Sequence, residues 1–143
     1  PSNDGLIYVC DRGADRIQVF RPDGTFVKEA QIAAETVGAG ATWDIAFSQD
    51  DQQEFIYVAD GSNMKVHVVD RDSLEVLYVI GEGGRQSGLF YGTHSIVTDS
   101  RGNFYTTETY EGKRIQKFQY QGLRPLEQIQ SGPAWPEGSL LGE

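Results

Sequence analysis

A short pattern, a tyrosine followed by two small or β-branched residues and an acid, recurs along the chain at a nearly constant spacing. Its copies begin at Tyr8, Tyr57 and Tyr105, which lie 49 and 48 residues apart. A polar turn and another β-prone run follow each copy. A period near 50 residues with several short strands is typical of β-propeller blades, which bury their sheets against one another. A β-sandwich also has many short strands, but it does not require in-register repeats, so the sequence favours a propeller.

Eleven short strands are expected, and their order assigns them to three successive blades. They span residues 6–11, 16–20, 25–32, 42–47, 57–60, 65–69, 75–80, 94–98, 104–107, 114–118 and 126–129. This order predicts one all-β, partial β-propeller domain of about three four-stranded antiparallel blades. The blades cover residues 1–41, 42–92 and 93–129, and residues 130–143 form a tail without a repeat. The first blade lacks a sequence for its inner strand.

An open arc of about three blades leaves one blade face uncovered at each end, whereas known propellers close with four to eight blades. Uncovered apolar faces and unpaired strand edges are rarely tolerated by soluble monomers. We therefore expect the chain to be part of a ring of about six blades. The ring would be completed by the rest of its own polypeptide or by a second copy, and the isolated chain is not expected to be a stable monomer.

The charge balance excludes one class of partner. The chain is acidic, with a formal net charge of −9, whereas binding to nucleic-acid phosphates requires a basic face. No run of 18 apolar residues is present, so no membrane-spanning helix is expected. Cys10 is the single cysteine, so an internal disulfide cannot form.

Two stretches, residues 8–20 and 106–118, resemble the NHL repeat. The likeness covers roughly residues 5–125 and is specific for the fold and weak for function. Among NHL proteins the chain looks most similar to the last three blades of the peptidyl-α-hydroxyglycine α-amidating lyase family. That resemblance implies a six-bladed zinc enzyme in which this chain is the C-terminal half, and it favours a secreted or periplasmic location.

The resemblance points to His94 as a zinc ligand. In the lyase family a Pro-His motif opens alternate blades, and three such histidines hold zinc, so Thr93-His94-Ser95 matches the last of them with Thr93 in place of proline. One histidine cannot hold a catalytic zinc, which commonly has three protein ligands. Ser95 stands where the family has an aspartate for a structural calcium, which puts calcium in doubt. The alternative is a channel-lining histidine bonded to a neighbouring group.

Three further residues are candidates for ligand contact. Arg12 matches an arginine at the lyase active site, which implies that it holds a substrate carboxylate; the alternative is an ion pair with a nearby aspartate. Trp43 opens the inner strand of the middle blade and is either a stacking platform or a plug, with plug favoured. Tyr110 lies in a turn that we expect at the channel mouth.

Two functions therefore stay open. The first is an NHL-type binding or scaffold propeller that recognises a ligand or protein, such as a peptide, at the channel mouth. The second, implied by the resemblance, is a zinc-dependent lyase that converts a hydroxyglycine-extended peptide into an amide and glyoxylate. We prefer the binding module for this chain, because its residues cannot supply the full zinc ligand set.

Overall fold

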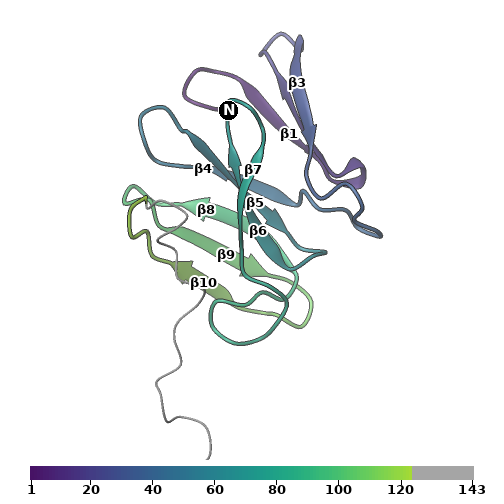
Figure 1. The fold of residues 1–143 in the computed structure, drawn as a ribbon, viewed down its shortest axis with the longest axis vertical. Helices are drawn as coiled ribbons and strands as arrows, with labels where there is room; N and C mark the ends of the chain where they lie inside the picture. The colour runs from purple at the N-terminus through teal and green to yellow at the C-terminus, as the bar shows by residue number, and fades with distance from the viewer. Residues whose placement is uncertain (124–143) are drawn as a thin grey trace, which may run out of the picture.

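The computed structural model describes residues 1–123, which form ten β-strands and one 3-10 turn, η1 (Arg12–Ala14) (Figure 1). The strands are β1 (Ile7–Asp11), β2 (Arg16–Phe20), β3 (Phe26–Gln31), β4 (Asp44–Phe47), β5 (Phe55–Asp60), β6 (Lys65–Asp70), β7 (Val76–Ile80), β8 (Thr93–Thr98), β9 (Phe104–Glu108) and β10 (Ile115–Phe118). The expected strand over residues 126–129 lies outside the described residues. No helix in the described part is long and apolar enough to cross a membrane.

The strands form three separate antiparallel sheets that follow one another in chain order. The first sheet has the order β1-β2-β3, the middle sheet β4-β5-β6-β7, and the third sheet β8-β9-β10. The sheets are arranged side by side as successive layers (Figure 1). The all-β propeller-segment prediction is confirmed, and residues 1–123 supply the first sheet with no inner strand equivalent to β4 or β8.

The strand registers preserve the sequence repeat. The three pattern tyrosines oppose equivalent positions of the following strand, in the pairs Tyr8–Val19, Tyr57–Val68 and Tyr105–Lys117. The residues that precede the equivalent cations Arg16, Lys65 and Arg114 also share a left-handed backbone, with φ of 54°, 57° and 47° at Asp15, Met64 and Lys113. Because non-glycine residues rarely adopt this conformation, its recurrence shows that the same turn is built three times.

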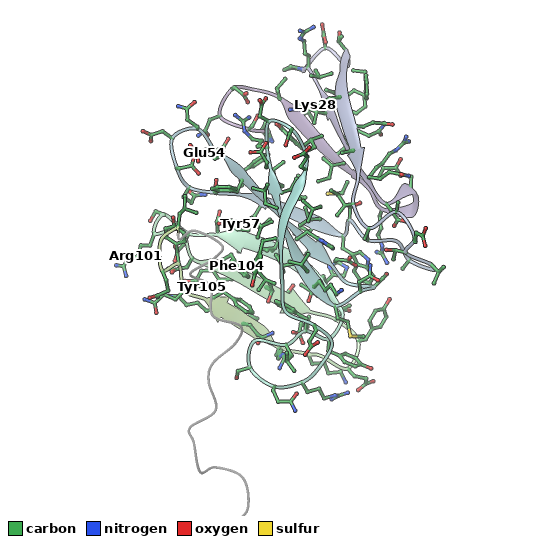
Figure 2. The ribbon with its side chains drawn as sticks, viewed as in Figure 1. Lys28, Glu54, Tyr57, Arg101, Phe104 and Tyr105 are labelled. Carbon is green, nitrogen blue, oxygen red and sulfur yellow. The ribbon has the colours of Figure 1, made fainter. Side chains whose placement is uncertain are left out.

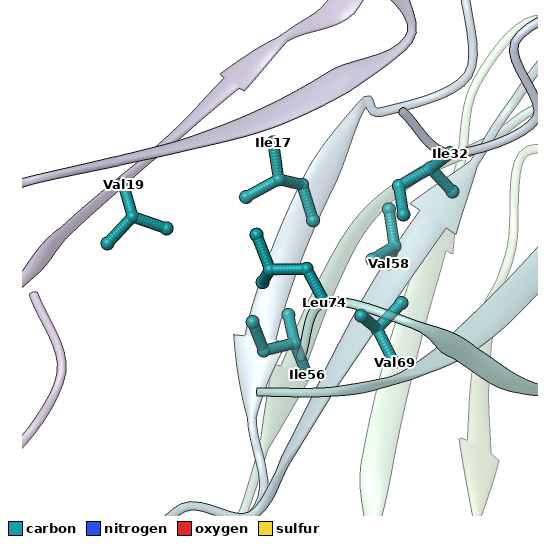
Figure 3. Packing of buried hydrophobic residues seen from close by; sticks show 7 residues of the cluster. All are labelled: Ile17, Val19, Ile32, Ile56, Val58, Val69 and Leu74. Carbon is teal, nitrogen blue, oxygen red and sulfur yellow. The ribbon is translucent and has the colours of Figure 1, made fainter. Parts of the chain in front are cut away.

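Two apolar cores lie between adjacent sheets. The first and middle sheets bury a cluster of Ile17, Val19, Ile32, Ile56, Val58, Val69 and Leu74 (Figure 3). The middle and third sheets bury Ala46, Tyr57, Ala59, Val66, Phe90, Ile96 and Phe104. In this second core the rings of Tyr57 and Phe104 lie 5.4 Å apart, and Figure 2 shows both on facing sheets. Each blade therefore depends on its neighbour for burial, as in other repeat proteins.

Candidate functional site

Trp43 lies at the centre of the candidate site, just before β4. Its backbone N–H donates to the Ala59 carbonyl at 2.9 Å, and its indole Nε1–H donates to the Gly40 carbonyl at 2.6 Å. Gly61 packs so closely that a Cβ there would lie 2.5 Å from Trp43 Cδ2. The indole is thus fixed by a hydrogen bond and by close contact with the backbone at Gly61.

Arg12, the first residue of η1, covers the Trp43 ring. Its guanidinium carbon lies 3.6 Å from the ring centroid, which is within cation–π distance. Its Nε–H donates to the Ala39 carbonyl at 2.6 Å. Among residues 1–123, neither terminal nitrogen of Arg12 has a hydrogen-bond or ion-pair partner. The alternative of an Arg12 ion pair is therefore not seen, because Asp11 bonds to Arg16 instead, at 2.8 Å.

His94, the second residue of β8, also borders Trp43. The two ring centroids lie 5.5 Å apart at an interplanar angle of 86°. The imidazole is exposed, and its Nδ1 lies 3.2 Å from the Ser95 hydroxyl, while Nε2 has no partner within the described chain. No group of three histidine, cysteine, aspartate or glutamate side chains in residues 1–123 is placed to hold a metal ion. The described residues could thus offer zinc His94 but not a complete ligand set.

Tyr110 completes the group from the turn that follows β9. Its ring centroid lies 6.4 Å from that of Trp43, and the residue is 66% exposed. Its backbone φ of 49° lies in the left-handed region, a conformation that is costly for a tyrosine and is often found at functional sites. Its ring rests against Gly92, where a Cβ would approach Tyr110 Cδ2 to 3.2 Å.

Arg12, Trp43, His94 and Tyr110, hereafter the mouth cluster, come from all three sheets. The sequence singled out all four, and the structure brings them together around one indole ring. The terminal nitrogens of Arg12, the Nε2 of His94 and the hydroxyl of Tyr110 have no partner in the described chain, and they belong to side chains that surround the indole ring. These groups can donate hydrogen bonds to an anionic or carbonyl-bearing ligand. Sequence reasoning missed Gly61, although a glycine directly after a strand is a signal of close backbone approach.

The acids at the ends of β1, β5 and β9 form a second, structural series. Asp11 binds Arg16, and Glu108 binds Arg114 through its Nε at 2.8 Å. Asp60, which is fully buried, instead accepts a hydrogen bond from the buried His67 at 2.8 Å. Each of these acids thus bonds to a residue in or directly before the strand that follows its turn, which indicates a turn-stabilising role.

Arg114 also holds the connection between the middle and third sheets. Its terminal nitrogens donate to the carbonyls of Gly84, Arg85, Gln86 and Leu89. The neighbouring Lys113 is exposed, whereas Arg114 is partly buried. At the equivalent place in the middle sheet, Lys65 and His67 line an open pocket of about 300 Å³.

Comparison with known proteins shows the fold and no family. No family model matches the chain, and no curated protein matches it in sequence. Hydrazine synthase of Kuenenia stuttgartiensis is similar in structure, with a TM-score of 0.60 and 18% identity over 80% of this chain and 31% of that one. A streptogramin B lyase gives a TM-score of 0.54 and 14% identity over 84% of this chain and 39% of that one. Both are β-propeller proteins, and this chain spans well under half of either.

Proposed function

We propose that the chain is part of an NHL-type β-propeller binding module that recognises a small carboxylate-bearing ligand, such as a peptide C-terminus, at the mouth cluster. The observation that carries this proposal is the position of Arg12, stacked on Trp43 with both terminal nitrogens lacking a partner within residues 1–123. A guanidinium with that geometry matches the two oxygens of a carboxylate.

The immobilisation of Arg12 favours binding. A free arginine side chain loses rotamer freedom when it binds, at a cost of roughly 0.5–1.5 kcal/mol. Here the Ala39 carbonyl and the Trp43 ring already restrict the side chain in the unliganded state. His94 and Tyr110 stand at the edge of the same ring, where they can contact the rest of the ligand.

The test uses N-acetylglycine as the probe and its uncharged amide as the matched control. Trp135→Phe removes the second tryptophan of the chain, so that fluorescence reports on Trp43 alone. We expect saturable changes in Trp43 emission with N-acetylglycine, no response to the amide, and loss of the response in Arg12→Gln. Arg21→Gln, an exposed arginine in the turn after β2, is the control variant. Equal responses to the acid and the amide, or an unaltered response in Arg12→Gln, would reject this role.

A second candidate function is a zinc-dependent lyase resembling the peptidyl-α-hydroxyglycine α-amidating enzymes. The favouring observation is that His94 and Arg12, the two residues that match the family site, lie against the same Trp43 ring. The described residues supply at most one zinc ligand, so the remaining ligands would have to come from other blades of the ring. Zinc analysis of the full-length protein with and without His94→Ala tests the idea, since unchanged zinc content excludes His94 as a ligand.

We also propose that the three sheets are one arc of a closed ring of about six blades. On the outer face of the third sheet, Val97 is 59% exposed and Ile115 is 73% exposed. The counterpart of Ile115 in the middle sheet, Val66, is fully buried against the third sheet. A further blade would cover the outer face in the same way. Light scattering tests this, because a monodisperse, cooperatively unfolding monomer of the isolated chain would show that the open faces are tolerated.

A further inference from the structure

An open pocket of about 300 Å³ lies against the connection between the first and middle sheets, and its volume is at the lower end of the range for small-ligand sites. It is lined by residues 33–36 of the connection and by Asn63, Lys65 and His67 of the middle sheet. None of the four mouth-cluster residues lines this pocket. It is therefore a site separate from the mouth cluster.

In the third sheet, an arginine side chain holds the equivalent connection. Arg114 lies 49 residues after Lys65 in the repeat, and its terminal nitrogens donate to four backbone carbonyls within residues 84–89. Gln116, the counterpart of His67, bonds the same connection through both its amide nitrogen and its amide oxygen. A guanidinium group and the amide beside it thus order the link between the middle and third sheets.

In the middle sheet, the corresponding bonds are missing. Within the part of the chain that the structure describes, the Lys65 ammonium has no hydrogen-bond or ion-pair partner, and the carbonyls of residues 34–36 accept no hydrogen bond. The Nδ1 atom of His67 is buried and also has no partner there. Buried polar atoms without a partner are uncommon in folded proteins. The pocket therefore has acceptors like those of the third sheet and lacks the donor that Arg114 supplies.

The charges around the pocket favour a cation over an anion. Asp60 is fully buried against His67, and Glu35 lies on the pocket wall. The Asn63 amide nitrogen already donates to Asp60 at 2.8 Å and to Thr36 at 2.7 Å, and the Thr36 hydroxyl donates to a backbone carbonyl at 2.7 Å. Apart from the Lys65 ammonium, these side chains leave an anion no free donor.

We propose that this pocket binds the guanidinium group of an arginine-bearing ligand. The guanidinium would donate to the carbonyls of residues 34–36, as Arg114 donates to those of residues 84–89. Lysine is a poor substitute for this contact, because its ammonium is a compact, strongly hydrated point charge, whereas a guanidinium presents five donors in a planar fork. Lys65 therefore leaves open the place that an arginine would fill.

Isothermal titration calorimetry of the full-length protein tests the proposal with N-acetylarginine amide as the probe. This compound has no carboxylate, so it does not report on the proposed carboxylate site at Arg12. N-acetyllysine amide, which has the same charge, is the matched control, and we expect it to bind at least about tenfold more weakly. Free arginine separates the two sources of the group: tighter binding of the free amino acid assigns a metabolite, and tighter binding of the blocked compound assigns a peptide side chain.

Two substitutions of Lys65 should change the affinity in opposite directions. Lys65→Ala removes a like charge and should tighten binding about threefold. Lys65→Arg keeps the charge but supplies a guanidinium from the chain itself, so it should weaken binding at least about tenfold. Hydrogen exchange gives a second readout, because the amides of residues 33–36 should exchange more slowly in Lys65→Arg and in the parent protein with bound probe.

Three results would overturn the proposal. The absence of saturable binding would mean that the pocket holds only solvent. Equal affinities for the arginine and lysine compounds would show that the site recognises charge and not the guanidinium fork. An affinity unaltered by Lys65→Arg, together with unchanged exchange over residues 33–36, would place the binding elsewhere on the protein.

Discussion

The Nε2 atom of His67 lies 2.8 Å from Oδ2 of Asp60, and both side chains are buried. The equivalent acids of the first and third sheets bind an arginine that begins the next strand, Arg16 or Arg114. In the middle sheet that position is Lys65, whose ammonium forms no ion pair within the described chain. In the middle sheet the buried acid is therefore bonded to a histidine, whereas its counterparts in the first and third sheets are paired with arginine.

Replacing His67 should destabilise the protein strongly. His67→Ala leaves Asp60 with Asn63 as its remaining hydrogen-bond donor, and removal of one partner from a buried pair typically costs about 3–5 kcal/mol. We expect a loss at the lower end of that range, measured as a shift in urea unfolding. The double variant Lys65→Arg/His67→Gln recreates the Arg-x-Gln pattern of residues 16–18 and 114–116, and should recover at least half of the loss. No recovery would mean that the three sites are not equivalent.

Gly61→Ala should move Trp43. The new methyl group would lie 2.5 Å from Trp43 Cδ2 and 2.7 Å from the Thr93 carbonyl oxygen, so the ring must shift. We expect a loss of about 1–3 kcal/mol in stability, as for other overpacked sites, and a change in Trp43 emission in the Trp135→Phe background. Gly13→Ala is the control, because a Cβ there meets no atom within 4 Å. Identical emission spectra for the two variants would show that the indole is not held by Gly61.

The loss of folding stability at low pH should depend on Asp99. Hydrogen bonds, first of all from the Asn103 side chain, lower the pKa of Asp99 to about 2. A lowered pKa in the folded state stabilises the fold fully above pH about 4 and loses this effect as the pH falls through about 2. Asn103→Ala should raise the pKa of Asp99 toward about 3.9, observed by carboxyl NMR titration. Ser100→Ala should leave the titration unchanged, and a similar shift in both variants would contradict this assignment.

Arg114→Ala should release the connection between the middle and third sheets. The substitution removes the bonds to its four carbonyls and leaves the buried Glu108 carboxylate without its cation. We expect a loss of about 3 kcal/mol and faster hydrogen exchange over residues 84–89. Lys113→Ala, whose ion pair is exposed, should change stability by less than about 0.5 kcal/mol. Unchanged exchange over the connection would show that Arg114 does not hold it.

The fold was predictable because equivalent residues of the repeat lie in the same environment in each blade. Tyr8, Tyr57 and Tyr105 could be aligned by eye, and their strand registers agree. Strand ends were less predictable: β4 begins at Asp44 rather than at residue 42, and the Thr42 hydroxyl donates to the Arg16 carbonyl of the preceding sheet. Contacts of this kind depend on a neighbouring blade and leave no local signal.

The candidate site was predictable in position and less so in detail. Repeat alignment places Arg12, Trp43, His94 and Tyr110 at the same end of the sheets, which is where the structure has them. The stacking of Arg12 on Trp43 depends on the path of residues 39–41, which no periodicity specifies. Likewise, the bond between His67 and Asp60 was not predictable, since the alternation within β6 says nothing about the acid seven positions earlier.

Because Arg114 holds residues 84–89, the structural unit that keeps its own contacts begins and ends at other residues than the sequence repeat does. If the chain were divided at the repeat boundary, the unit of residues 42–92 would contain the connection, but Arg114, which holds it, would belong to the next unit. A division after β10, at residue 118, would keep the connection and its arginine together with β8 and β9. A blade duplicated or exchanged by design should therefore be joined within the turn that follows its third strand, because the unit then retains the arginine contacts that order its link.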